Sequence, residues 1–205
     1  MSGVTRLFLI RHGDTADEET KKIYKGALDI PLSEKGRSRM KMASAFLSRF
    51  HLDHIYSSAL SRCTESGSII SRPHSISLRA LTGLNEISFG AWEGLSFEEI
   101  AKAYTDHFRL WLADPETHSP PGGETLRDAE KRINLAIDGI LAEHRSQTIA
   151  VVAHGGVLRL VLCSKLGLKF SHLFRLAQDY GGISILDVYE DGSTVVKLIN
   201  FTYYM

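Results

Sequence analysis

The stretch VTRLFLIRHGDTAD, residues 4–17, changes character in its middle. Its first half contains the aliphatic run from Leu7 to Ile10, which is typical of a buried strand. Arg11, His12 and Gly13 follow directly, and small polar and acidic residues come next. In an open α/β sheet, ligands bind outside the carboxyl ends of the strands. The stretch therefore predicts a first strand whose end brings an arginine and a histidine to a ligand-binding edge.

Strand-like and helix-like segments alternate along the rest of the chain. We expect strands at residues 4–10, 54–56, 75–78 and 148–153. Helical spacing follows Ser33 and recurs at 58–70, after the capping-box pairs Ser96–Glu99 and Thr125–Asp128, and at 155–166. Asp191-Gly192 predicts a hairpin turn between 183–189 and 194–199. This order predicts an α/β sandwich with a mostly parallel sheet and an antiparallel edge hairpin, as one domain over residues 1–205.

The composition excludes several classes of protein. Of 205 residues, 43% are hydrophobic and 23% are charged, and the formal net charge is +0. These ordinary values argue against a nucleic-acid or anionic-membrane surface. Cys63 and Cys163 lie far apart, which makes a disulfide framework or a cysteine-based zinc site improbable. No signal peptide and no membrane span of ~20 apolar residues is recognisable, so we expect a cytoplasmic protein.

Basic side chains follow three of the expected strands. Arg11 and His12 follow the first, Arg62 lies about one turn into the helix after the second, and His154-Gly155 follows the fourth. Any one of them alone would be an ordinary surface or structural residue. Gathered at one edge they repel one another, so an anion with several charges is the economical explanation. A phosphate dianion suits the planar fork of arginine, and the helix start at Gly155 adds partial positive charge.

Two histidines beside a bound phosphate can divide the work of phosphoryl transfer. An unprotonated imidazole attacks phosphorus and forms a phosphohistidine. The other imidazole, protonated by the nearby dianion, stabilises charge on the phosphoryl oxygens. The leaving alkoxide needs a proton, which a carboxyl group near a multiply charged phosphate can supply. Glu86, in the loop after the third expected strand, is the candidate donor, and Glu93 is its competitor.

Five blocks of the sequence resemble those of the histidine phosphatase superfamily, also called phosphoglycerate-mutase-like. They read LIRHGDT, SSALSRC, LNEISFGAWEGLS, PPGGETL and VVAHGG, and together they cover roughly residues 4–190. The resemblance implies a three-layer αβα sandwich whose chemistry uses no metal and no cofactor. It also implies His12 as the phosphorylated nucleophile, Glu86 as the proton donor, and a phosphate pocket of Arg11, Arg62 and His154.

The compact segment between WEGLSFEEI and PPGGETL is similar to the phosphatase branch, because the mutases are typically longer there. Within that branch the pattern resembles α-ribazole phosphatase and the broad-specificity phosphatases. We therefore expect hydrolysis of a small-molecule phosphate monoester, with α-ribazole phosphate as a candidate. Two alternatives stay open, a phosphoglycerate mutase and a non-catalytic phosphate-binding module. Self-association into a homodimer also stays open.

The chain departs from the family pattern on one flank of the expected pocket. Glu18 stands where relatives often have asparagine, and Lys25-Gly26 stands where many have Gln-Gly. A carboxylate near a dianion weakens binding unless Glu18 turns outward or Lys25 compensates. The candidate contacts to the leaving group are Lys25, Gly26, Phe89 and Trp92.

Overall fold

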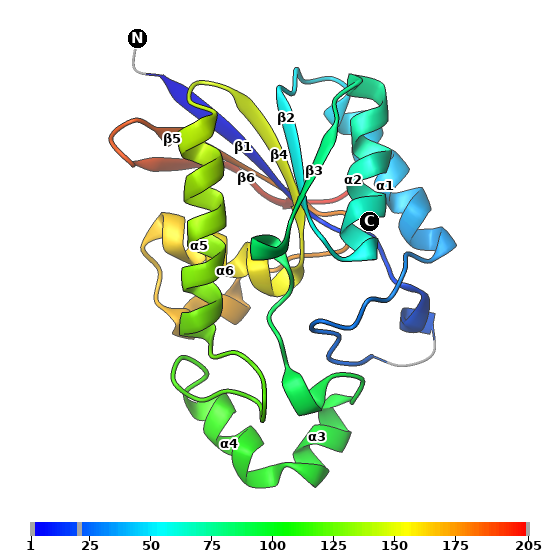
Figure 1. Cartoon of the computed structure of the whole chain (residues 1–205), viewed down its shortest axis with the longest axis vertical. Helices are drawn as coiled ribbons and strands as arrows, with labels where there is room; N and C mark the ends of the chain where they lie inside the picture. Colours follow the sequence, from blue (N-terminus) through cyan, green and yellow to red (C-terminus); the bar gives the residue numbers. More distant parts are fainter. Residues whose placement is uncertain (1–2, 20–21, 204–205) are drawn as a thin grey trace.

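Six strands form one sheet in the middle of the molecule (Figure 1). The computed structural model describes residues 3–19 and 22–203. The strands are β1 (Val4–Arg11), β2 (His54–Ser58), β3 (Leu78–Leu81), β4 (Thr148–Ala153), β5 (Ile183–Tyr189) and β6 (Thr194–Phe201). Across the sheet their order is β3-β2-β4-β1-β5-β6. The first four run parallel, and β5 and β6 form an antiparallel edge, which confirms the predicted sheet.

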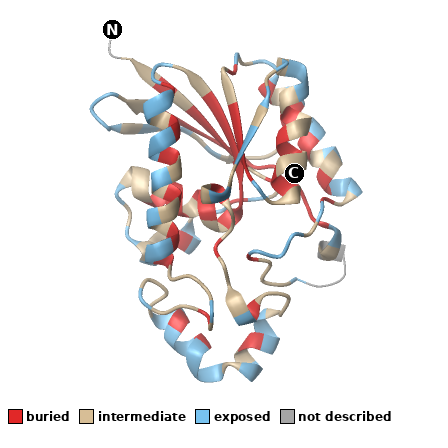
Figure 2. Ribbon diagram, viewed as in Figure 1, coloured by how far each residue is buried: buried red, intermediate tan, exposed pale blue. Residues whose placement is uncertain are grey.

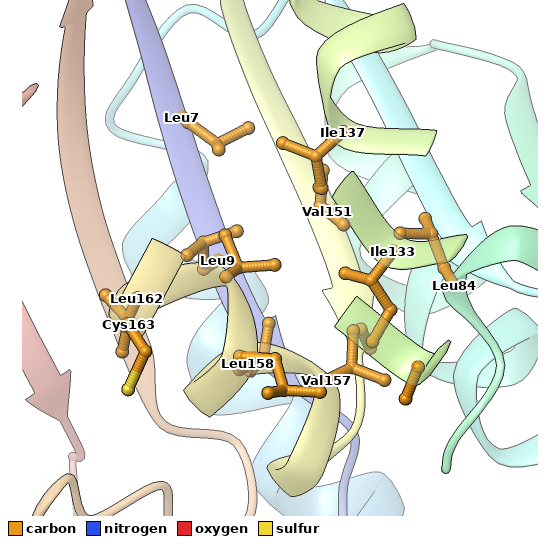
Figure 3. Packing of buried hydrophobic residues seen from close by; sticks show 14 of the residues in the cluster. Leu7, Leu9, Leu84, Ile133, Ile137, Val151, Val157, Leu158, Leu162 and Cys163 are labelled. Atoms are coloured by element: carbon orange, nitrogen blue, oxygen red, sulfur yellow. The ribbon is translucent and has the colours of Figure 1, made fainter. Parts of the chain in front are cut away.

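Helices cover both faces of this sheet. Leu7 and Leu9 of β1 pack against α5 (Leu126–Glu143) and α6 (Gly155–Leu166), as Figure 3 shows. The alternate residues Phe8 and Ile10 face α1 (Glu34–Leu47) and α2 (Ser61–Ser71). All four side chains are 0% exposed, because a central strand between two helical layers is buried on both faces. The three-layer αβα sandwich is thereby confirmed.

Side-chain caps begin three of the helices where the sequence predicts them. The Ser33 hydroxyl accepts the Gly36 N–H at 3.0 Å and starts α1. Ser96 forms a complete capping box with the third residue of α3 (Phe97–Ala103). At Thr125 only half of the predicted box forms, because the carboxylate of Asp128 accepts from the Thr125 hydroxyl at 2.7 Å. Aspartate is one methylene shorter than the glutamate of a capping box, so its carboxylate stays beside the hydroxyl.

Three predicted boundaries are wrong by a few residues. The third strand is expected at 75–78 but β3 begins only at Leu78, because Ser75 adopts a left-handed φ of 56° at the end of a 3-10 turn. The helix expected at 58–70 begins at Ser61, since β2 continues through Ser58. The last strand runs beyond 199 to Phe201. Pairing between strands in the folded sheet determines where these elements begin and end. Local sequence spacing does not reveal this pairing.

Besides the hydrophobic cores on the two faces of the sheet, a third and smaller cluster of buried hydrophobic side chains lies beyond the carboxyl edge of the sheet. There α3 and α4 (Thr105–Ala113) project away from the main body (Figure 1). Its buried members, which we call the α3–α4 core, are Trp92, Ile100, Phe108 and Trp111. Figure 2 shows the outer faces of these two helices as exposed. The described residues also form 3-10 turns, namely η1 (Ala16–Glu19), η2 (Arg72–His74), η3 (Thr82–Leu84), η4 (Gly90–Trp92) and η5 (Phe170–Arg175). In the described part of the chain, no helix has the length and apolar character needed to cross a membrane.

Candidate active site

The predicted basic residues and Glu86 meet at the carboxyl edge of the sheet. β1 ends at Arg11, so His12 is the first residue beyond it, while Arg62 is the second residue of α2. Glu86 comes in the loop after β3, and Gly155 begins α6. All five line one cavity of about 430 Å³. The parallel strands therefore bring together residues that are far apart in the sequence.

The hydrogen bond of His12 determines which ring nitrogen is free to react. The side chain is 2% exposed. Its Nδ1 lies 2.7 Å from the carbonyl oxygen of Gly13. Because a carbonyl oxygen only accepts, the proton of the neutral imidazole belongs on Nδ1. Nε2 then keeps its lone pair and is the nitrogen available for attack on phosphorus.

His154 lies directly behind the cavity wall. Its ring is 0% exposed and meets the ring of His12 edge-on, with centroids 5.1 Å apart. Arg62 Nε donates to Nδ1 at 3.2 Å, so Nε2 carries the proton and donates to Ser58 Oγ at 2.8 Å. Ser58 passes a hydrogen bond on to Asn85 Oδ1 at 2.9 Å. His154 thus supports Arg62, and its direct contact with phosphate stays a prediction.

Burial keeps both imidazoles neutral near pH 7. Burial lowers the pKa of His12 well below its usual value, and the charges of Arg11 and Arg62 lower it further. Burial also lowers the pKa of His154 well below its usual value, with further contributions from His12 and Arg62. A neutral imidazole is the form that a nucleophile requires.

Two buried neutral histidines make stability depend on pH. An unfolded histidine has a pKa of about 6.5, so below that pH the unfolded chain takes up protons that the folded site excludes. This stability is complete above about pH 6.5 and is lost as the pH falls towards the lowered folded-state values. We expect urea denaturation to show a loss of up to about 1.4 kcal/mol per pH unit for each histidine. His12→Asn should remove one contribution, and an unchanged pH dependence in that variant would contradict the neutral state of His12.

Backbone carbonyl groups hold the two arginines. Arg62 is 1% exposed and donates from Nη1 to Leu28 O at 2.6 Å and from Nη2 to Gly26 O at 2.9 Å. Arg11 donates from Nη1 to Gln178 O at 2.6 Å. Its Nε is buried with no hydrogen-bond partner among the described residues. Leaving a buried donor unpaired is costly, so an anion beside this guanidinium would be favourable.

Glu86 is the better placed of the two candidate acids. Its Oε2 accepts the Gly156 N–H at 3.3 Å, and its Oε1 accepts the N–H of Ile87 at 3.0 Å. Glu93 lies outside the described residues that line the cavity. Its Oε1 instead accepts from the backbone of Ala27 at 2.9 Å and of Phe89 at 3.0 Å, so it joins two loops. The geometry favours Glu86 as the proton donor.

The absence of a side chain at Gly156 leaves room for the Glu86 carboxylate. A Cβ at this position would lie 2.6 Å from Glu86 Oε1 and 2.8 Å from Ile87 Cδ1. We expect Gly156→Ala to displace the carboxylate and to lower kcat by about 10- to 100-fold in a phosphate-release assay. Gly139→Ala is the control, because a Cβ there has no neighbour within 4 Å. It should leave kcat unchanged, and a Gly156→Ala enzyme with wild-type kcat would contradict the predicted displacement.

The structure places three of the four predicted leaving-group contacts at the cavity. Lys25, Gly26 and Phe89 line it. The prediction for Trp92 is wrong, because this indole is 0% exposed and packs inside the α3–α4 core. The side chain of Glu18 lies outside the described residues, so its effect on the cavity stays a prediction.

Much of the cavity wall consists of residues that no sequence motif indicated. Arg159 adds a further basic side chain to the lining, and Tyr180 lies against Arg11. Three aromatic side chains from α3, α4 and η5 complete the apolar side, namely Phe97, Trp111 and Phe174. Phe97 is 50% exposed and Phe174 is 65% exposed, as expected for apolar groups around a binding site. In the described part of the chain, no group of three or more His, Cys, Asp or Glu side chains is arranged to hold a metal ion.

The chain is similar to known proteins along most of its length. Residues 7–201 match the model of the histidine phosphatase superfamily, branch 1. The chain belongs to this superfamily. This histidine phosphatase is therefore a phosphoric monoester hydrolase by family.

Named relatives cover nearly the whole histidine phosphatase chain. Phosphoserine phosphatase 1 of Hydrogenobacter thermophilus is 30% identical over 195 residues, which is 95% of this chain and 92% of that protein. The adenosylcobalamin/alpha-ribazole phosphatase of Salmonella typhimurium is 27% identical over 195 residues, with 95% and 96% covered. The solved structure of Bacillus stearothermophilus YhfR matches with a TM-score of 0.87 at 29% identity, covering 95% of this chain and 96% of that one.

Proposed function

We propose that this histidine phosphatase hydrolyses a small-molecule phosphate monoester through a phosphohistidine formed on His12. In the first step Nε2 of His12 bonds to phosphorus, the ester oxygen leaves, and Glu86 gives that oxygen its proton. In the second step Glu86 takes a proton from the water that attacks phosphorus. The P–N bond then breaks, phosphate is released, and Nε2 regains its lone pair.

The hydrogen bond between His12 Nδ1 and the Gly13 carbonyl is the observation that carries this proposal, because it leaves Nε2 unprotonated at the cavity. The surrounding charges suit the rest of the reaction. Arg11 and Arg62 line the cavity, and the N-terminus of α6 lies beside them. Such preorganised positive groups stabilise the charge that develops on the transferred phosphoryl oxygens.

α-Ribazole phosphate is the proposed candidate substrate. Its leaving group carries an aromatic base, and the cavity offers aromatic walls from Phe89, Phe97, Trp111 and Phe174. A cavity of about 430 Å³ lies in the range of small-molecule sites. Burial of a flat ring against such walls is favourable. The name of the Salmonella relative supports the same choice.

Rapid-quench labelling with a ³²P-phosphate ester tests the mechanism. We expect a label on the protein that is stable in base and labile in acid, and that is missing from His12→Ala. Product analysis then separates the alternatives. Isomerisation of phosphoglycerate faster than phosphate release would identify a mutase, and phosphate binding without turnover of any ester would identify a binding module. Steady-state kcat/KM for α-ribazole phosphate, phosphoserine and glycerol phosphate tests the substrate, and a preference for glycerol phosphate would contradict it.

A further inference from the structure

Tyr180 lies on a loop, residues 176–182, that is joined to the end of β1 by backbone hydrogen bonds. The Gly181 N–H is shared between the carbonyl oxygens of Arg11 at 3.0 Å and His12 at 3.2 Å. The carbonyl oxygen of Gly182 accepts the Arg11 N–H at 3.1 Å. The position of Tyr180 is therefore coupled to that of the two residues that begin the active site.

Asn200 of β6 holds the same loop from the opposite side. Its Oδ1 accepts the Asp179 N–H at 2.7 Å, and its Nδ2 donates to Asp179 Oδ2 at 2.7 Å. Asn200 has a φ of 49°, a left-handed conformation that asparagine adopts more readily than most residues. Unfavourable backbone conformations persist where surrounding contacts enforce them, often near functional sites. The loop thus gives Tyr180 a rigid base.

The ring of Tyr180 faces the phosphate-binding arginine. Cζ of Arg11 lies 3.8 Å from the ring centroid, and the ring of His12 lies 5.4 Å away. A guanidinium at this distance from an aromatic face is held by a cation–π interaction. Together with the bond from Arg11 Nη1 to Gln178 O at 2.6 Å, the ring restrains the plane of the guanidinium. The Nε that is buried without a hydrogen-bond partner among the described residues is thereby held in one orientation.

The hydroxyl of Tyr180 reaches a second cation of the cavity. Lys25 Nζ lies 3.4 Å from it and 3.2 Å from Asp17 Oδ2. The residue after Lys25 is Gly26, whose carbonyl oxygen accepts from Arg62 at 2.9 Å. The hydroxyl therefore connects the loop that supports Arg62 with the loop that supports Arg11. Tyr180 is thereby linked to both arginines that line the cavity.

We propose that Tyr180 is a positioning residue with two separable actions, its ring orienting Arg11 and its hydroxyl holding Lys25. The inference rests on the proposed function and adds a residue that the family motifs quoted above do not contain. Orientation of Arg11 matters most when charge develops on the phosphoryl oxygens, so the ring acts on kcat. Lys25 lines the cavity and is a predicted contact to the leaving group, so we expect it to bind the ester equally in the ground state and the transition state, and the hydroxyl to act on KM.

Two substitutions separate the ring from the hydroxyl. Tyr180→Phe keeps the ring, and we expect kcat within about twofold of wild type and a KM raised about 3- to 10-fold. Tyr180→Leu removes both groups, and we expect kcat to fall about tenfold or more as well. Tyr189→Phe, on β5 outside the cavity, is the matched control and should change neither constant. Wild-type kinetics in Tyr180→Leu, or equal losses of kcat in the Phe and Leu variants, would overturn the proposal.

A double-mutant cycle with Lys25→Met tests the hydroxyl separately. If the hydroxyl acts through Lys25, Tyr180→Phe should leave KM unchanged in the Lys25→Met background. A full rise of KM in that background would overturn this part of the proposal, and the cycle decides it even if Tyr180→Leu does not fold. The His12→Ala variant tests the proposed function separately from the role of Tyr180. Wild-type turnover in His12→Ala would contradict the proposed function. An inactive His12→Ala enzyme combined with wild-type kinetics in the Tyr180 variants would overturn only the role of Tyr180.

Discussion

His12→Ala is expected to lower kcat by at least about 10³-fold for every phosphate ester that the enzyme hydrolyses, because the substitution removes the atom that bonds to phosphorus. The loss should not depend on the leaving group, since no ester can form the covalent intermediate. Binding should survive, because Arg11, Arg62 and the start of α6 remain at the cavity. Phosphate release under saturating substrate measures the first effect, and equilibrium binding of inorganic phosphate measures the second.

The control for this variant is His107→Ala, which changes an exposed histidine of α4 and should leave kcat unchanged. Circular dichroism and thermal unfolding show whether the His12 variant keeps its fold. A folded His12→Ala enzyme that retains more than about a tenth of wild-type kcat would contradict nucleophilic catalysis by His12.

Glu86→Gln is expected to lower kcat by about 10²- to 10³-fold for alkyl phosphates, whose leaving oxygen needs a proton. With 4-nitrophenyl phosphate the first step should be nearly unaffected, because nitrophenolate leaves without protonation. The second step still needs Glu86 as the base that activates water. We therefore expect a burst of one nitrophenol per active site followed by slow turnover, measured by stopped-flow absorbance.

Glu93→Gln is the matched control, because Glu93 belongs to the same loop but lies outside the described residues that line the cavity. The amide keeps one oxygen that accepts from the backbone of Ala27, so the loops should stay joined. The dependence of rate on leaving group should match wild type. Equal losses for alkyl and nitrophenyl esters in Glu86→Gln, without a burst, would show that Glu86 does not handle protons.

The sandwich fold and the basic residues of the site could be predicted from the sequence. Apolar runs indicate the buried strands, and the residues directly after these strands indicate the site. The run Leu7 to Ile10 is apolar at every position, which is typical of a central strand between two helical layers. Once parallel strands are expected, the residues after them must share one edge. Arg11, His12 and Arg62 accordingly line the same cavity.

The aromatic wall of the cavity could not be predicted, because aromatic residues occur both in cavity walls and in hydrophobic cores. Phe97 and Trp92 are both aromatic residues in the same segment, yet the first is 50% exposed at the cavity and the second is 0% exposed inside the α3–α4 core. Sequence spacing does not distinguish a cavity wall from a small core. Tyr180 gave no signal either, because its role depends on a loop placed by Asn200 and by β1.

The order of strands in the sheet also has a consequence for biosynthesis. β1 pairs with β4 and β5, and Asn200 of β6 supports the loop beside them. His12 is thus synthesised well before β4, β5 and Asn200, which support it. At about 5–20 residues per second, this separation corresponds to roughly 10 to 40 s of translation. During that interval the nascent chain carries His12 without β4 and β5, the two strands that pair with β1.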